Sequence, residues 1–136
     1  DFVVPAVELI AARTHRVDPA SGKARGVLDT ISDNAANAGL VLGGNWLRPG
    51  DVDLRHVGGL LYQNGRIEES GVSAAVMNHP ANAVAWLVRR LAMFDIGLNA
   101  ADVVLSGSFT RPVVVAPGDV FHVDYAEMGA LTCSFV

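Results

Sequence analysis

Glu8 is the only charged residue in the apolar stretch VVPAVELIAA, residues 3–12. Its position raises the question of what neutralises its negative charge. The flanking apolar residues predict a strand buried on both faces, where a bare carboxylate costs several kcal/mol. Two interpretations are open. In the first, Glu8 pairs with an arginine such as Arg13, or the strand twists enough to expose the carboxylate. In the second, the carboxylate binds a hard metal ion, Mg²⁺ or Mn²⁺, which prefers oxygen ligands and requires further ones.

Two further segments gather polar side chains among small residues. In TISDNAANAG, residues 30–39, Asp33 and Asn34 are either helix caps or groups that face a ligand held close to the backbone. In SGSFTRP, residues 106–112, hydroxyls, a glycine and Arg111 share one loop. Free N–H groups and a guanidinium there would hold a carboxylate, although an ordinary crossing loop is equally consistent with the pattern.

The histidines and the single cysteine are weaker candidates for metal binding or catalysis. The four histidines show no metal-ligand spacing such as HxH or HExxH, which disfavours a histidine-rich metal site. His79 precedes a predicted helix, and a cap or a hydrogen-bonded core imidazole is favoured over an acid or base. Cys133 alternates with polar residues in ALTCSFV, which predicts the buried side of a strand rather than a reactive thiol.

The elements that must position these residues are mostly strands. Residues 13–26 predict a surface loop, residues 27–39 a short helix or tight turn, and residues 40–44 a short strand. Asn64-Gly65 predicts a type I′ hairpin, because both residues tolerate positive φ. One helix is predicted over 79–95, with Pro80 in its first turn and apolar residues at i, i+3, i+4 and i+7. Later strands are predicted at 101–107, 113–119, 120–125 and 130–136.

The amino-acid composition favours some classes of protein and argues against others. The chain has 136 residues, 51% of them hydrophobic and 18% charged, which predicts one compact domain with one core. A net charge of −4 argues against nucleic-acid binding. A single cysteine fits a reducing cytoplasm. The sequence has neither a long apolar run nor a basic-then-apolar leader, so we expect neither a membrane span nor a signal peptide.

Four strings carry a family resemblance: PAVELI, DTISDNAANAG, IEESGVSAAVMNHPANAVAWL and GSFTRPVVVAPGDVFHVDY. Together they resemble the C-terminal half of enzymes in the hydratase and decarboxylase branch of the fumarylacetoacetate hydrolase superfamily. The resemblance covers residues 1–136, which are therefore expected to be the C-terminal part of a single catalytic domain. It implies a mixed α+β, strand-rich fold, a β-roll of mixed sheets with few helices, in a homo-oligomeric protein.

The resemblance also implies a divalent metal, usually Mg²⁺, held by three acidic side chains. Glu8 matches the third of them, and the other two belong to an E-x-E motif upstream of this chain. Asp33 and Asn34 match a loop beside the pocket and are the catalytic candidates. Enzymes of the family have a loop that closes over the metal-bound end of the substrate. Gly107, Ser108 and Thr110 match this substrate-binding loop, and Arg111 follows them in the sequence.

For the complete enzyme, the resemblance implies addition of water to a seven-carbon 2-hydroxy-2,4-diene dicarboxylate in aromatic meta-cleavage catabolism. The alternatives are hydration of 2-oxopent-4-enoate, decarboxylation of 4-oxalocrotonate, or a non-catalytic fragment or partner subunit. The second carboxylate of a diacid needs a cation of its own. The candidates are Arg13, His15, Arg16, Lys23, Arg25 and Arg111.

Overall fold

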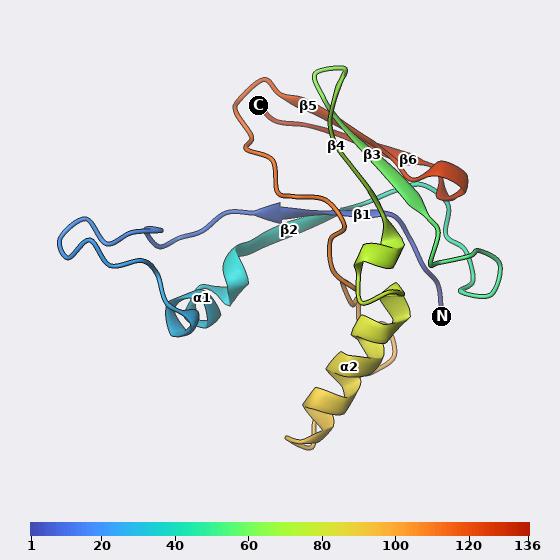
Figure 1. Ribbon diagram of the computed structural model, residues 1–136, viewed down its shortest axis with the longest axis horizontal. Coiled ribbons are helices and arrows are strands. Elements are labelled where there is room, and N and C mark those ends of the chain that lie inside the picture. The colour runs from blue at the N-terminus through green and yellow to red at the C-terminus, as the bar shows by residue number, and fades with distance from the viewer. The chain divides into compact units, whose positions relative to one another are not determined.

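The computed structural model describes residues 1–136 and divides into two compact units (Figure 1). The small unit is residues 6–42, and the large unit is residues 1–5 with residues 43–136. The sequence predicts one core, whereas the buried apolar side chains lie almost entirely in the large unit. In the small unit only Asp33 and Ala36 are buried, so polar contacts rather than a core must hold it.

The small unit is a two-stranded antiparallel sheet with a long connection. Strand β1 (Ala6–Ile10) pairs with β2 (Asn37–Leu42). The connection extends as a loop over residues 13–26 and returns through helix α1 (Val27–Ser32) and the 3₁₀ turn η1 (Asn34–Ala36), as the blue and cyan segments of Figure 1 show. The predicted loop and short helix are confirmed, and the strand predicted at 40–44 begins earlier, at Asn37.

The expectation that the first strand is buried on both faces is wrong. Ala6, Val7 and Leu9 of β1 are partly buried, but Glu8 and Ile10 are exposed. The physical reason is that β1 has a single partner strand, and an isolated pair of strands covers little of its own side-chain surface. Glu8 therefore avoids the desolvation cost that its apolar neighbours suggest.

The large unit is built on a four-stranded antiparallel sheet in the order β4–β3–β5–β6. Its strands are β3 (Gly58–Gln63), β4 (Arg66–Val72), β5 (Val120–Asp124) and β6 (Ala130–Ser134). Asn64 and Gly65 join β3 to β4 with φ values of 53° and 81°, which confirms the predicted hairpin. The predicted final strand pair is also confirmed as β5 and β6, and Cys133 is half-buried in β6.

A small apolar cluster forms the core of the large unit. Its buried side chains are Val57, Val76, Phe121, Val123, Met128 and Leu131. The 3₁₀ turn η3 (Ala126–Met128) contributes Met128 to this core, and the buried residue of the 3₁₀ turn η2 (Ser73–Ala75) is the polar Ser73.

The predicted long helix is confirmed as α2 (Pro80–Ala92). Its N-cap is His79, whose imidazole Nδ1 accepts a hydrogen bond of 3.1 Å from the backbone N–H of Ala81. His79 is thus a cap, the role the sequence favours over acid–base chemistry.

The strands predicted at 101–107 and 113–119 are wrong. Both segments are irregular, and apolar residues such as Val103 and Val114 are exposed. A run of β-branched residues makes a strand only where a sheet edge is available to pair with it, and neither segment pairs. The chain contains no helix long and apolar enough to cross a membrane.

Candidate functional site

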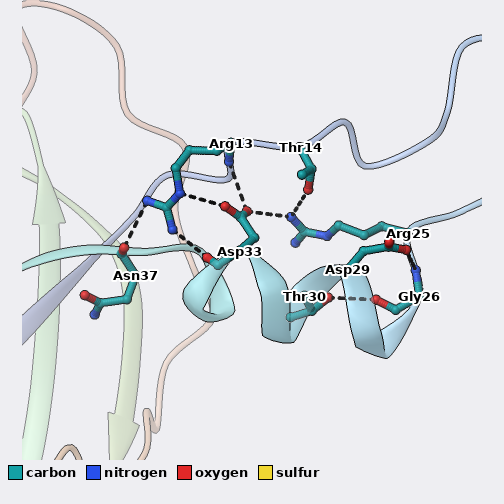
Figure 2. A network of polar contacts seen from close by, with 8 residues as sticks. All are labelled: Arg13, Thr14, Arg25, Gly26, Asp29, Thr30, Asp33 and Asn37. Carbon is teal, nitrogen blue, oxygen red and sulfur yellow. Dashed lines mark hydrogen bonds and ion pairs between the residues drawn. The ribbon is translucent and has the colours of Figure 1, made fainter.

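Asp33 is the centre of a polar network in the small unit (Figure 2). Its side chain is only 2% exposed. Oδ1 accepts a hydrogen bond of 2.7 Å from Nε of Arg13, and Oδ2 accepts from the Arg13 backbone N–H at 3.0 Å and from Nη1 of Arg25 at 3.2 Å. Asp33 follows the last turn of α1, but its carboxylate holds the two arginines instead of capping a helix.

The same contacts decide the charge of Asp33. Burial raises the pKa of the Asp33 carboxyl, but hydrogen bonds from Arg13 and the charges of Arg13 and Arg25 together outweigh burial. The pKa therefore lies below its usual value, and the group is ionised near neutral pH. Because both oxygens are already occupied, this geometry suits an anchor better than a proton acceptor.

Asn34 lies on unusual backbone next to this anchor. Asn34, Ala35 and Ala36 have φ values of 51°, 53° and 62°, in the left-handed region that non-glycine residues rarely adopt. Two hydrogen bonds of 2.8 Å hold the turn, from the Ala36 N–H to the Asp33 carbonyl and from the Ala11 N–H to the Ala36 carbonyl. The exposed Asn34 carboxamide makes no hydrogen bond within the chain, so it is available to a ligand.

Glu8 lies on the exposed face of β1, and its Oε1 accepts a hydrogen bond of 2.9 Å from Nδ2 of Asn37. The suggested ion pair with Arg13 is wrong, because Arg13 binds Asp33, whereas the exposed position suggested as its alternative is confirmed. An exposed carboxylate with no cationic partner has the chemistry of a hard-metal ligand. The chain has no group of three or more His, Cys, Asp or Glu side chains that could hold a metal, so these residues offer one ligand rather than a whole site.

Phe109 positions the loop of residues 106–112 in the large unit. Gly59 of β3 and Gly71 of β4 are paired across the hairpin. A Cβ on Gly59 would lie 2.5 Å from ring atom Cε2 of Phe109, and one on Gly71 would lie 2.1 Å from the Phe109 carbonyl oxygen. The ring also meets Tyr125 edge-on, with 6.0 Å between centroids. The pattern of the loop itself does not predict this anchor, but glycines within strands are a signal of such a close approach.

The predicted substrate-binding residues of this loop lie close together. Ser108 Oγ donates to the Thr110 carbonyl at 2.9 Å and accepts from the Thr110 N–H at 3.2 Å. Gly107 precedes them with φ 114°, a conformation that favours glycine. The loop thus presents a local turn of hydroxyls and backbone groups.

Arg111 already has a carboxylate partner within the chain. Its Nη2 and Nε lie 2.6 Å and 2.8 Å from Oε1 of Glu69. Both residues line an open groove of about 320 Å³ that also contains Glu68. Two glutamates beside the guanidinium disfavour an anionic ligand in this groove.

The cationic candidates therefore divide into two groups. Arg13 and Arg25 bind Asp33, and Arg111 binds Glu69. His15, Arg16 and Lys23 form no ion pair within the chain. Arg16 and Lys23 are therefore the candidates whose positive charge no carboxylate of the chain balances.

The chain is similar to known enzymes in sequence and in fold. No protein-family model matches the chain. The chain is 57% identical over 136 residues to 2-oxo-hept-4-ene-1,7-dioate hydratase of Escherichia coli, covering 51% of that protein. It is 39% identical over 135 residues to the TodF product hydratase of Pseudomonas putida, covering 48% of it. It covers 49% of the structure of 4-oxalocrotonate decarboxylase from P. putida G7 complexed with magnesium and adipate, with 33% identity and a TM-score of 0.88.

The chain spans about half the length of the curated relatives it matches. The match to the decarboxylase structure includes 100% of this chain, which confirms the expected mixed, strand-rich fold. The resemblance inferred from the four sequence strings is confirmed as well. Over its whole length the chain is thus similar in sequence to 2-oxo-hept-4-ene-1,7-dioate hydratase, and in sequence and fold to 4-oxalocrotonate decarboxylase.

Proposed function

We propose that the protein containing this chain is a divalent-metal-dependent hydratase. It adds water to 2-hydroxyhepta-2,4-diene-1,7-dioate, the dienol form of 2-oxo-hept-4-ene-1,7-dioate, to give 4-hydroxy-2-oxoheptanedioate in homoprotocatechuate-type aromatic catabolism. The observation that supports this proposal is the 57% identity, over every residue, to a hydratase named for this diacid. Identity to 4-oxalocrotonate decarboxylase of P. putida is lower, at 34%.

In this proposal residues 1–136 are the C-terminal part of the catalytic domain, and they supply the metal ligand Glu8. Its exposed carboxylate without a cationic partner supports the assignment. The other ligands belong to a part of the protein beyond these residues. When bound, Mg²⁺ or Mn²⁺ supplies positive charge that stabilises the negative charge developing on the 2-oxo group.

The residues of this chain would then hold and orient the diacid. Ser108, Thr110 and the backbone at Gly107 bind the carboxylate next to the 2-oxo group, as hydroxyls and N–H groups commonly do for anions. Asn34, whose carboxamide is free, orients the substrate or the attacking water, and Asp33 fixes the turn that carries it. Arg111 positions the loop through Glu69. The far carboxylate pairs with Arg16 or Lys23, whose charges are not balanced within the chain.

Decarboxylation of 4-oxalocrotonate is the second candidate function, and the structural match to that decarboxylase favours it. The same stabilised charge on the 2-oxo group would serve loss of carbon dioxide as well as addition of water. Fold and metal therefore do not discriminate between the two reactions, but the product does.

We further propose that the protein is cytoplasmic and homo-oligomeric and binds neither nucleic acid nor membrane. The acidic net charge of −4 supports the absence of nucleic-acid binding. Association is supported by α1, whose apolar side chains Val27, Leu28 and Ile31 are 72%, 74% and 67% exposed. Apolar surface of this kind is usually covered by protein.

Product analysis tests the reaction. The full-length protein is incubated with Mg²⁺ and, in separate reactions, with 2-hydroxyhepta-2,4-diene-1,7-dioate, 2-hydroxypenta-2,4-dienoate or 4-oxalocrotonate. The organic product is identified by NMR, and released carbon dioxide is measured. The proposal expects 4-hydroxy-2-oxoheptanedioate without carbon dioxide, and faster turnover of this diacid than of 2-hydroxypenta-2,4-dienoate. Stoichiometric carbon dioxide from 4-oxalocrotonate would establish the second candidate instead.

A further inference from the structure

Asn37 links Glu8 to the ion-pair network around the buried Asp33 carboxylate of the small unit. Its side-chain Nδ2 donates a hydrogen bond of 2.9 Å to Oε1 of Glu8. Its backbone carbonyl accepts one of 3.2 Å from Nη1 of Arg13, as Figure 2 shows. Asn37 is thus held through its backbone while its carboxamide binds Glu8.

A register shift places the Asn37 side chain where it can reach Glu8. In β1 and β2, Leu9 pairs with Gly39, but the next residue, Ile10, pairs with Asn37 instead of Ala38. Side chains alternate along a strand, so Ile10 and Glu8 share one face. Without the shift Asn37 would oppose the residue after Ile10 and face away from Glu8. Bulges of this kind commonly re-aim a side chain beside an active site.

The hydrogen bonds that hold the Asn37 backbone lead back to the buried carboxylate of Asp33. Arg13 binds both the Asp33 carboxylate and the Asn37 carbonyl, and a hydrogen bond of 2.8 Å from Ala11 to Ala36 closes the strands beside it. Glu8 has no such support of its own, because its side chain lies on an exposed face. A free glutamate side chain loses rotamer entropy when it binds a ligand, and a hydrogen bond that already orients it reduces this cost.

We propose that Asn37 is a positioning residue that presents the Glu8 carboxylate to a divalent cation. Its amide occupies Oε1 and leaves Oε2, which has no partner within the chain, to bind the ion. The inference rests on the proposed function, because it takes Glu8 to be a metal ligand. Loss of a hydrogen bond that orients a metal-binding side chain typically weakens metal affinity about 10–100-fold.

Calorimetric titration of the metal-free, full-length protein with Mn²⁺ tests the proposal. The variants are Asn37→Leu, which keeps the side-chain volume without a donor, and Asn37→Ala as a second truncation. Thr30→Val is the matched control, since it removes the hydroxyl bond of 3.1 Å from Thr30 to the Gly26 carbonyl in the same unit without touching Glu8. Glu8→Gln is measured in parallel, together with the unfolding midpoint of each metal-free variant.

The proposal expects both Asn37 variants to raise the Mn²⁺ Kd about 10–100-fold, while Thr30→Val leaves it within twofold. A purely structural role would lower the metal-free unfolding midpoint and leave the Kd unchanged, and that result overturns the inference. If Glu8→Gln abolishes binding and the Asn37 variants retain it, the positioning role alone is wrong. If Glu8→Gln itself binds Mn²⁺ normally, the proposed metal role of Glu8 fails as well.

Discussion

Substitution of Gly59 by alanine should destabilise the large unit because Phe109 occupies the space of a side chain there. The added Cβ would lie 2.5 Å from Cε2 of the ring, closer than Cβ atoms in real structures approach, and 3.0 Å from Cζ. The ring must move, and it is half-buried, so its contacts with the hairpin and with Tyr125 are disturbed. The loop that carries Ser108 and Thr110 would shift with it.

The expected cost of Gly59→Ala is about 1–3 kcal/mol in the free energy of unfolding, the usual range for overpacking. Gly58→Ala is the matched control, because a Cβ on this adjacent glycine meets nothing within 4 Å and its φ is not positive. Replacing glycine at a compatible position is expected to stabilise by about 0.4–1 kcal/mol. The two neighbouring substitutions should therefore have opposite signs.

A double-mutant cycle with Phe109→Ala, measured by urea denaturation, isolates the contact. Removal of the ring should relieve Gly59→Ala, with a coupling energy of about 1–3 kcal/mol. Gly71→Ala should stay destabilising in the same background, because its Cβ would meet the Phe109 carbonyl oxygen at 2.1 Å, a backbone clash that remains when the ring contact at 2.9 Å is removed. Equal effects of Gly58→Ala and Gly59→Ala, or a coupling energy near zero, would refute the packing of Phe109 on these glycines.

Three other outcomes are expected. Asp33→Asn should destabilise the protein at pH 7 but progressively less below about pH 3.9. The pKa of Asp33 is lower in the folded than in the unfolded state, so the ionised carboxylate stabilises the fold above the unfolded pKa, and this stabilisation is lost as the pH falls through the folded pKa. Equal destabilisation at pH 7 and pH 3 in urea unfolding contradicts this. Ala35→Gly should raise the free energy of unfolding by about 0.5–1 kcal/mol, because Ala35 has φ 53° and glycine adopts this conformation without strain. Ala38→Gly in β2 should lower it by about as much, and thermal unfolding of both variants checks the left-handed turn. Burial raises the pKa of the Cys133 thiol, so iodoacetamide should alkylate it more slowly than free cysteine at pH 8 and faster after denaturation; a native rate equal to that of free cysteine would be inconsistent with the half-buried position.

Local signals in the sequence predict much of this fold. Asn64-Gly65 specifies its turn within two residues, and α2 begins at a proline after a capping histidine and carries an apolar stripe. The last two strands alternate clearly enough to be recognised. In contrast, the apolar run at 101–107 looks like a strand but pairs with no other strand, and its local pattern does not reveal this.

The site is less predictable because its contacts join distant residues. Arg13 binds Asp33 across 20 positions, which no spacing rule anticipates, and so Asp33 looks like a cap in the sequence. The exposure of Glu8 depends on β1 having a single partner. The contact between Asn37 and Glu8 depends on a one-residue bulge, which neither strand announces.

The central claim is that Glu8 provides a ligand for the divalent cation of a hydratase. The most direct measurement is the initial rate at which the ultraviolet absorbance of 2-hydroxyhepta-2,4-diene-1,7-dioate disappears, at increasing Mg²⁺, for the full-length protein and for its Glu8→Gln variant. The account predicts a saturable dependence on Mg²⁺ that the variant loses while it remains folded. A rate independent of Mg²⁺, or a Glu8→Gln variant with the same Mg²⁺ dependence as the unaltered protein, would contradict it.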